Sequence, residues 1–183
     1  MSDAELAEPG VEAAGLRAES RPVSPDELRT FAGHFATGVA VVTSRSPDGT
    51  LCGVTINAVS SLSLDPPLFL VCLDHRSNTL GSVLESRRFG LHFLARDQAR
   101  LSQVFASKVT DKFAAVDHEI SANGVPLLGG VLAAAECRVT EVCPGGDHTI
   151  VLGAVEAIRA NGGEPLLYHR GAYAALKPAT PHA

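Results

Sequence analysis

The sequence predicts a mainly β fold, a closed or partly closed antiparallel barrel with a few α-helices outside it. Segments with strand patterning outnumber helical ones along the 183 residues, a length that suits one domain. Most connections between them are short enough to join antiparallel neighbours. We expect this domain over residues 24–178, behind a disordered acidic tail at 1–23 with too few large apolar groups to offset the entropy of ordering.

The first element expected is a helix over residues 24–36. Ser24 can cap it, Pro25 suits the first turn, and Glu27 completes a capping box. The apolar residues that follow fall on one face of this helix: Leu28, Phe31, Ala32 and Phe35. Gly38 marks its end.

A β-hairpin comes next, with strands over 38–45 and 50–64. The turn between them carries Pro47, Asp48 and Gly49, which are typical turn residues. A further strand over 66–73 has the pattern of one buried on both faces. Because Pro66 and Pro67 stand at its start, we expect this strand to begin at a sheet edge or at a bend.

The rest of the chain predicts two helices and four strands. We expect a capped helix over 77–89, a short strand over 90–95 and a helix over 96–107. After a polar loop, long strands are expected over 131–143, 148–160 and 164–176. Pairs of glycines mark the turns between these last three strands.

One face of the segment 53–67 is unusual. Strand alternation places neutral, mostly hydrogen-bonding side chains on this face: Thr55, Asn57, Val59, Ser61 and Ser63. An ordinary solvated strand would carry charges, yet none occurs before Asp65. By the residues alone, the face fits a plain exposed strand or an oligomer contact about as well as a ligand site.

Composition excludes several function classes. The net charge is −5 and no run of Lys and Arg occurs, so nucleic-acid binding is not expected. No apolar run is long enough to span a bilayer and no basic signal opens the chain, so we expect a cytoplasmic protein without membrane association. The four cysteines form no C-x-x-C pair and are expected to be inert thiols.

Familiar catalytic motifs do not occur in the chain. It has no G-x-G-x-x-G, P-loop, H-E-x-x-H or G-x-S-x-G pattern. The seven histidines are scattered without convincing metal-ligand spacing, so no metal site is expected. Any chemistry is therefore expected to come from a cofactor that the protein holds in place.

Several ordered motifs resemble the flavin reductase family, over about residues 27–176. They are FATGVAVVTS, GVTINAVSSLSLDPPLFLVCL, SNTL, FGLHFLARDQARLSQVFA, DKF, GDHTIVLGAVEAI and PLLYHRGAYAAL. The resemblance implies an antiparallel flavin-binding split β-barrel. It is strongest to the reductase components of two-component monooxygenases, which pass a hydride from NADH or NADPH to FAD or FMN. The reduced flavin goes to a separate oxygenase, and such reductases are usually homodimers.

The resemblance also implies flavin contacts. Residues matched to flavin-ring and ribityl contacts are Thr37, Thr55, Asn57, Ala58, Val59, Ser60 and Ser61. Ser77 and Thr79 match an S-x-T element that holds the flavin phosphate, and a helix N-terminus favours an anion. Without the resemblance, both could simply cap that helix. Lys112 of DKF could reach the phosphate or only solvent.

Two other motifs imply the residues that contact the nicotinamide nucleotide. GGDHT at 145–149 matches a G-D-H element, so His148 is the candidate catalytic residue, although such a histidine could also be a surface or capping residue. Asp147 could orient His148 or cap the turn. The last strand implies cofactor contacts from Tyr168, Arg170, Gly171 and Tyr173, with Arg170 on a dinucleotide phosphate. The tyrosines could equally be core residues.

The sequence departs from the family pattern at His92, where many relatives carry Asn, so the local polar contacts are expected to differ there. The choices between FAD and FMN, and between NADH and NADPH, are not decided. A non-catalytic flavin-binding or redox-sensing module, and a split-barrel flavin oxidase with a retained cofactor, are the alternative functions.

Overall fold

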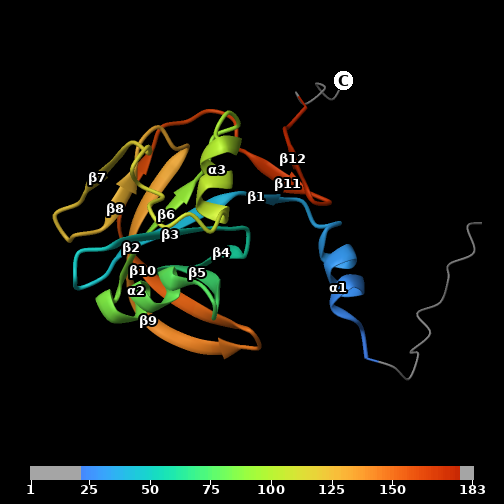
Figure 1. Ribbon diagram of the computed structural model, residues 1–183, viewed down its shortest axis with the longest axis horizontal. Coiled ribbons are helices and arrows are strands. Elements are labelled where there is room, and N and C mark those ends of the chain that lie inside the picture. The colour runs from blue at the N-terminus through green and yellow to red at the C-terminus, as the bar shows by residue number, and fades with distance from the viewer. Residues whose placement is uncertain (1–21, 178–183) are drawn as a thin grey trace, which may run out of the picture.

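The computed structural model describes residues 22–177, and its main feature is a seven-stranded antiparallel sheet in the order β3-β2-β6-β9-β10-β5-β4 (Figure 1). Its strands are β2 (Ala40–Arg45), β3 (Leu51–Ile56), β4 (Val59–Leu64), β5 (Pro67–Asp74), β6 (Arg88–Phe93), β9 (Ala133–Gly145) and β10 (His148–Ala160). The other elements are α1 (Pro25–Ala32), α2 (Asn78–Ser86), α3 (Ala99–Ala106), β1 (Thr37–Gly38), β7 (His118–Ile120), β8 (Pro126–Leu128), β11 (Leu167–His169) and β12 (Ala172–Ala174).

The two edge strands of this sheet are neighbours in the chain. Only Asn57 and Ala58 separate β3 from β4, which lie at opposite ends of the strand order. Because two residues cannot cross a flat seven-stranded sheet, the sheet must curl until its edges approach each other. The predicted antiparallel split barrel with outer helices is thereby confirmed.

The single strand predicted over 50–64 is wrong. It breaks at Asn57 and Ala58, where the chain passes from one edge of the sheet to the other. The alternation of side chains therefore does not run unbroken across the segment. The turn before it is confirmed, because the Gly49 amide donates to the Ser46 carbonyl at 2.9 Å and Gly49 has a φ of 91°.

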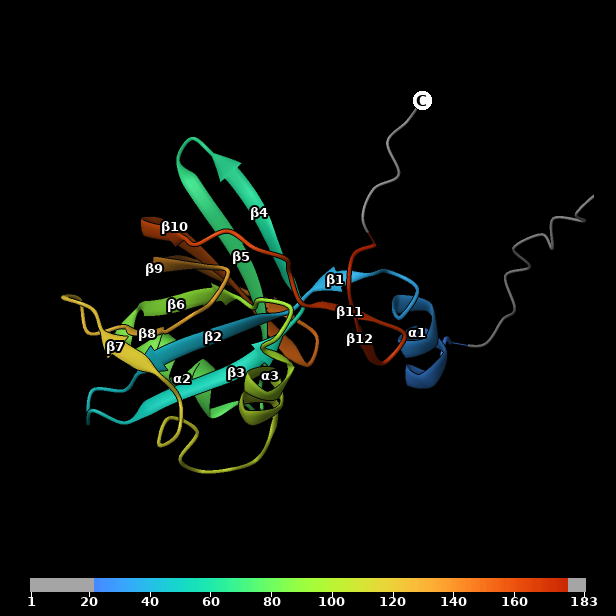
Figure 2. The same cartoon turned by 90° about the horizontal axis from the view of Figure 1, so that it is seen from above.

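The strand predicted over 66–73, which is β5, is less buried than the expected burial on both faces. β4 and the first half of β5 project from the barrel as an arm (Figure 2). Val71 and Leu73 of β5 are buried, whereas Pro67 is exposed and the residues from Leu68 to Leu70 are half-buried. The bend expected at the prolines is present at the arm's tip, with a cis peptide between Asp65 and Pro66.

The core has two parts on opposite faces of β2. Val42 faces a cluster with Val83 of α2 and Phe89 of β6. Val41 faces a second cluster, around Phe105 of α3 and Leu128 of β8. Strand alternation explains the division, since neighbouring side chains of β2 point to opposite faces. The helices α2 and α3 therefore cover different faces of the sheet.

Three other predicted elements differ from the structure. The helix expected over 77–89 stops at Ser86, because Arg87 is left-handed with a φ of 58°, and the chain continues into β6. The strand expected over 164–176 is a hairpin, because Arg170 and Gly171 both have positive φ (51° and 81°) and reverse the chain. The polar loop that was expected contains the short hairpin of β7 and β8.

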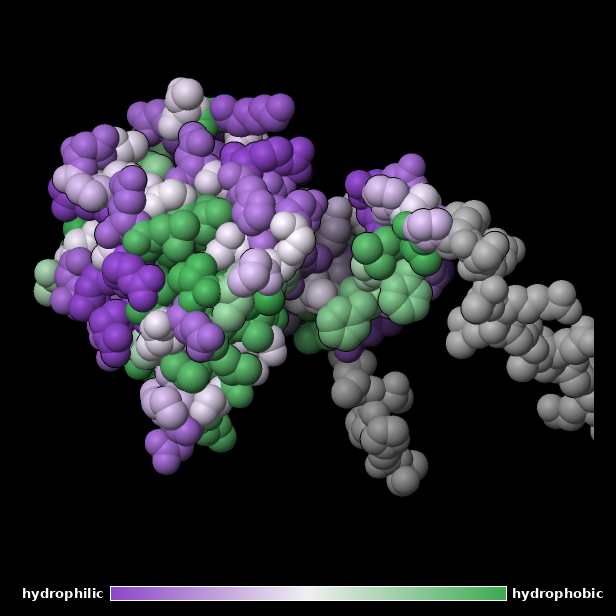
Figure 3. Space-filling view, turned by 90° about the horizontal axis from the view of Figure 1, so that it is seen from below, coloured by the Kyte–Doolittle hydropathy of each residue, from purple (hydrophilic) through white to green (hydrophobic). Residues whose placement is uncertain are grey.

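The first helix forms with the predicted caps but without a buried face. The Ser24 hydroxyl accepts from the Glu27 amide at 3.3 Å, and the Glu27 carboxylate accepts from the Ser24 amide at 2.9 Å. The helix ends at Ala32 rather than at 36 and, with β1, β11 and β12, stands apart from the barrel (Figures 1 and 2). Phe31 and Phe35 are 78% and 77% exposed, and Figure 3 shows this apolar surface.

The predicted tail lies outside the described residues except for its last two positions, and the domain boundary at 24–178 stays a prediction. Within residues 22–177, no helix combines the length and hydropathy needed to cross a bilayer.

Candidate functional site

The C-terminal end of β5 brings together several predicted site residues that are far apart in sequence. The carbonyl of Ala58 accepts from the amide of Cys72 in β5 at 3.0 Å. His148 of β10 lies opposite Asp74, the last residue of β5. The Ser77 amide donates to the Asp74 carbonyl at 2.9 Å. This strand end therefore joins the β3–β4 junction, the start of α2 and the turn that carries His148.

An ion pair neutralises the carboxylate at this strand end. The guanidinium of Arg76 contacts both oxygens of Asp74, with Nε 3.1 Å from Oδ1 and Nη2 2.6 Å from Oδ2. Hydrogen bonds from Arg76 hold the pKa of Asp74 well below its usual range, and the nearby His148 adds to this. Asp74 is therefore ionised at neutral pH, and Arg76 is already paired.

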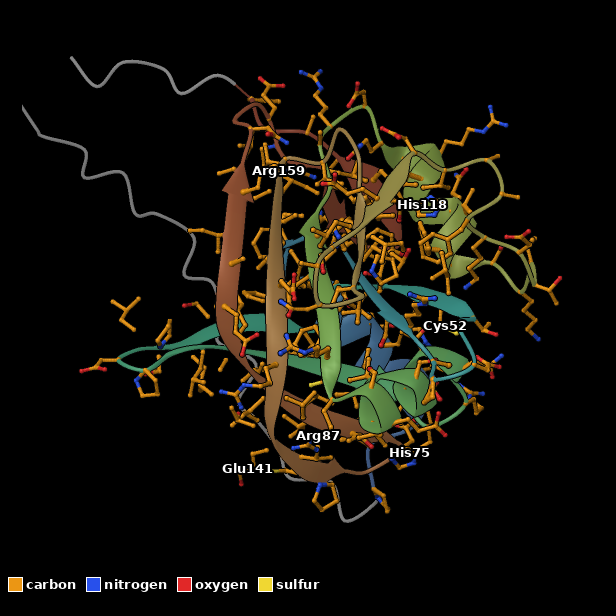
Figure 4. All side chains as sticks on the ribbon, turned by 90° about the vertical axis from the view of Figure 1, so that its left-hand side faces the viewer. Cys52, His75, Arg87, His118, Glu141 and Arg159 are labelled. Carbon is orange, nitrogen blue, oxygen red and sulfur yellow. The ribbon has the colours of Figure 1, made fainter. Side chains whose placement is uncertain are left out.

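His148 is oriented by its neighbour. Its Nδ1 lies 2.7 Å from Oδ1 of Asp147, and this contact lowers the pKa of the Asp147 carboxyl. The Asp147 carbonyl accepts from the amide of His75 at 3.1 Å, which ties the turn to the end of β5. Figure 4 shows His75 at this end of the molecule. Of the two predicted roles of Asp147, the structure supports orientation of His148, whose side chain stays 39% exposed.

A pocket of about 710 Å³ lies along the free edge of β3, between the start of α2 and the end of α3. Its lining includes the predicted Ser77, Thr79 and Lys112, together with Asn78 and Lys108, which sequence reasoning missed. Thr79 is only 2% exposed, and no described residue hydrogen-bonds its hydroxyl. Ser77 occupies the N-cap position, but its side chain makes no capping bond, so the predicted cap is wrong.

Lys112 is held by backbone carbonyls at the edge of this pocket. Its Nζ donates to Phe105 O at 2.8 Å and to Gly53 O at 3.0 Å. Partial burial lowers its pKa. An ammonium group has three N–H donors, so one is left for a ligand in the pocket.

A second group of predicted residues surrounds α3 and the small sheet. The hydroxyl of Tyr173 donates to Ser102 Oγ at 2.9 Å, and Thr55 Oγ1 donates to the Ser102 carbonyl at 2.7 Å. Tyr168 packs edge-to-face on Tyr173, with ring centroids 5.9 Å apart. Both rings are 37% exposed, so neither is a core residue. Ser102 was missed because both of its contacts span long sequence separations.

Two further predicted residues lie beside these tyrosines. Thr37 of β1 pairs with Tyr168 of β11. Its Oγ1 is the one buried side-chain polar atom without a hydrogen-bond partner among the described residues. Arg170 Nη2 lies 2.6 Å from His34 Nε2, and Arg170 occupies the turn between β11 and β12 with Gly171.

The remaining predicted flavin contacts lie at the β3–β4 junction, outside the lining of the large pocket. Asn57, Ala58, Ser60 and Ser61 are exposed, and Ser60 Oγ donates to the carbonyl of Ser61 at 3.1 Å. Val59 is half-buried against the α2 side of the core. These residues are therefore available at the surface where the barrel edges meet.

Other parts of the molecule show weaker site features. A pocket of about 320 Å³ includes His118 and Arg159, at the end opposite His75 (Figure 4). Its Arg159 is paired with Glu119 at 2.9 Å. Among residues 22–177, no three His, Cys, Asp or Glu side chains gather as around a metal ion.

Comparison with known proteins identifies the family. The model of the flavin reductase like domain matches residues 32–177, so this chain belongs to that family. It is 39% identical over 158 residues to the reductase component of a 4-nitrophenol 4-monooxygenase/4-nitrocatechol 2-monooxygenase from Rhodococcus opacus, covering 86% of this chain and 84% of the relative. It is also 42% identical over 149 residues to a probable flavin reductase from Rhizobium meliloti.

The Rhizobium protein is longer. The match covers 81% of this chain but 48% of that relative, so the chain spans about half its length. A similar solved structure is the NADH:FAD oxidoreductase of Streptomyces globisporus in complex with NAD and FAD fragments. The two share 32% identity with a TM-score of 0.80, over 87% of this chain and 98% of the other.

Proposed function

We propose that this chain is an NAD(P)H:flavin oxidoreductase that reduces FAD or FMN and supplies the reduced flavin to a separate monooxygenase. The observation that carries the proposal is the convergence at the end of β5. There the neutral β3–β4 junction, the hydroxyls at the start of α2 and His148 lie around one strand end. The names of the relatives support the same reaction and the same kind of partner.

The residues present fit a flavin. The hydroxyl of Thr37 is buried and lacks a hydrogen-bond partner among the described residues. Buried polar groups are normally hydrogen-bonded, so this hydroxyl is suited to a ligand with donors and acceptors. The stretch from Asn57 to Ser61, exposed except for the half-buried Val59, carries no charge and only small or medium side chains, which suits the edge of a planar ring.

Distinct residues would hold the two ends of the flavin. Ser77, Thr79 and the free donor of Lys112 would bind the phosphate at the helix N-terminus. The junction residues, with Thr37 and Thr55, would bind the ring and ribityl chain. A flavin held there would supply the ring that accepts a hydride, and the nicotinamide nucleotide would supply the hydride. The protein positions the reactants and excludes water, and no acid or base of this chain is required for that transfer.

The nicotinamide nucleotide would lie beside His148 and the β11–β12 hairpin. Asp147 fixes the ring of His148, which would orient the carboxamide or steady charge near the flavin. Arg170 would bind a phosphate of the dinucleotide, beside Tyr168, Gly171 and Tyr173. We favour NADH and FAD because the similar Streptomyces enzyme is named for both.

The apolar surface supports a homodimer. Phe31 and Phe35 on the α1 side are strongly exposed, and Leu64 at the tip of the β4–β5 arm is 91% exposed. Large apolar groups of this kind commonly mark protein interfaces. Light scattering on the purified protein would give twice the chain mass, and a monomer would contradict the dimer. The cytoplasmic location stays a prediction.

The reaction is tested by following NADH consumption with added FAD, with FMN and with neither. The proposal expects slow consumption without flavin and a rate that rises and saturates with added flavin. A colourless protein at the start would also favour flavin as an exchanging substrate over a retained cofactor. A tightly held yellow flavin with no NADH consumption would support the oxidase or sensor alternatives instead.

A further inference from the structure

Ser102 connects two parts of the candidate site that come from different segments of the chain, strand β3 and the β11–β12 hairpin. It lies in the middle of α3 and is 1% exposed. Its backbone carbonyl accepts from Thr55 of β3, and its hydroxyl accepts from Tyr173 of β12. One buried residue therefore contacts a predicted flavin residue and a predicted nicotinamide residue at the same time.

The helix that carries Ser102 is fixed closely against β3. A Cβ atom on Gly53 would lie 2.5 Å from Cε1 of Phe105, so α3 approaches the strand where only glycine fits. Lys112 adds a second link, because it binds carbonyls of both Gly53 and Phe105. Ser102 is thus attached to a rigid support, which is a requirement for accurate positioning.

The β11–β12 hairpin has few other attachments to the barrel. β11 pairs with β1, and Leu166 just before it exchanges backbone bonds with the barrel, accepting from the Val39 amide at 3.0 Å and donating to the Leu94 carbonyl at 2.9 Å. At the turn, the Arg170 amide donates to the Gly33 carbonyl at 3.0 Å, outside the barrel. Within residues 22–177, β12 pairs with β11 alone, and all three of its residues are exposed. Among the described residues, Ser102 is the hydrogen-bond partner of the Tyr173 hydroxyl. Through the contact between the rings, the bond also restrains Tyr168.

We propose that Ser102 is a positioning residue that aligns the Tyr168–Tyr173 pair with the β3 strand and so shapes the nicotinamide side of the site. The proposal rests on the reductase function proposed above. It separates two contacts: the Ser102 hydroxyl acts through Tyr173, whereas its carbonyl acts through Thr55. Removal of the hydroxyl alone should therefore affect nicotinamide binding and leave flavin binding intact.

The kinetic test compares Ser102→Ala with Tyr173→Phe and the double variant. Since a neutral hydrogen bond contributes about 1 kcal/mol, each single change should raise KM for NADH about fivefold. The double variant should add nothing further, because both changes remove one bond. KM for flavin and kcat should stay as in the wild type. Thr55→Val should instead raise KM for flavin.

A matched control is Ser44→Ala. Ser44 is fully buried, and its hydroxyl donates to the Arg88 carbonyl at 2.9 Å, away from the candidate site. The Ser44→Ala variant should lose folding stability as Ser102→Ala does, but its KM for NADH and its KM for flavin should stay unchanged. An unchanged KM for NADH in folded Ser102→Ala, or additive effects with Tyr173→Phe, would overturn the proposal. Wild-type protein without NADH oxidation would instead contradict the reductase function.

A spectroscopic test does not depend on activity. The chain has two tyrosines and no tryptophan, so ring-labelled tyrosine gives NMR signals only from Tyr168 and Tyr173. Tyr168→Phe assigns them. The proposal expects Ser102→Ala to shift and broaden the Tyr173 signal, and Ser44→Ala to leave it in place. If Ser102→Ala leaves the Tyr173 signal unchanged, the hydroxyl does not hold that ring and the proposal fails.

Discussion

The ring of His148 is held by the carboxylate of Asp147, with 2.7 Å between Nδ1 and Oδ1. The lowered pKa of Asp147 keeps this carboxylate ionised, so Nδ1 of His148 carries the hydrogen and donates it. Nε2 is then left to face a ligand. His148 also lies opposite Asp74, so its position is fixed at the end of β5.

His148→Ala should reduce turnover without weakening flavin binding. Loss of the oriented ring should lower kcat/KM by about 10- to 100-fold, the effect expected when reactants are misplaced. Steady-state NADH oxidation and flavin fluorescence quenching measure the two quantities separately. His75→Ala is the control, because His75 contributes its backbone amide to Asp147. Wild-type kinetics in His148→Ala would refute the role of this residue.

Thr79→Val should weaken FMN binding but leave riboflavin binding unchanged. The lost bond would be made to a charged phosphate, and such bonds contribute about 1.5–3 kcal/mol, so Kd for FMN should rise at least about tenfold. Ser77→Ala should behave in the same way. Riboflavin has no phosphate and serves as the matched ligand. Equal losses for both ligands would show that these hydroxyls do not bind the phosphate.

Acid should destabilise the protein through His92. Its Nε2 accepts from the Leu128 amide at 3.1 Å, and Nδ1 lies 3.1 Å from the Val41 carbonyl, so the folded ring is neutral. Burial lowers the pKa of His92 to about 4 from 6.5. Between these values the unfolded chain binds a proton and the folded protein does not, so the stability supplied by the neutral ring falls as pH drops.

The expected loss from His92 is about 3 kcal/mol between pH 6.5 and pH 4. Urea unfolding at several pH values measures it. His92→Asn removes the titrating ring, so the free energy of unfolding of this variant should change less between pH 6.5 and pH 4. This holds even if the variant is less stable than the wild type at neutral pH. If wild type and variant lose stability in parallel, His92 is not responsible for the acid sensitivity.

Gly53→Ala should destabilise the protein by about 1–3 kcal/mol, because the added methyl group would overlap the ring of Phe105 and push α3 from β3. Gly81→Ala is the matched change, since nothing lies within 4 Å of its Cβ position in α2. Helix propensity predicts that it stabilises by up to about 1 kcal/mol. Thermal unfolding compares the two, and an equal response of both variants would contradict the close packing at Gly53.

Local sequence signals predicted much of the fold. The turn at Pro47, Asp48 and Gly49 and the capping box at Ser24 and Glu27 each depend on residues within a few positions, and the structure contains both. The break between β3 and β4 contains no glycine or proline, so no local sequence signal predicted it. Arg170 adopts positive φ without being glycine, so the hairpin there was not recognised.

The candidate site was predicted less completely, for a related reason. Motif resemblance pointed to residues such as Ser77 and His148, but not to their partners. Ser102 contacts Thr55 and Tyr173 at sequence separations of 47 and 71, which no local pattern encodes. The amphipathic pattern of α1 was visible in the sequence, but the pattern alone could not show that Phe31 and Phe35 stay exposed.

The most direct test of the central claim is anaerobic mixing of the protein with FAD and NADH while flavin absorbance is followed. Without oxygen, loss of the oxidised flavin spectrum reports hydride transfer itself. A flavin reductase should bleach the flavin far faster than a protein-free mixture does, and His148→Ala should bleach it more slowly. Bleaching no faster than without protein, with FAD and with FMN and from both NADH and NADPH, would contradict the reductase function.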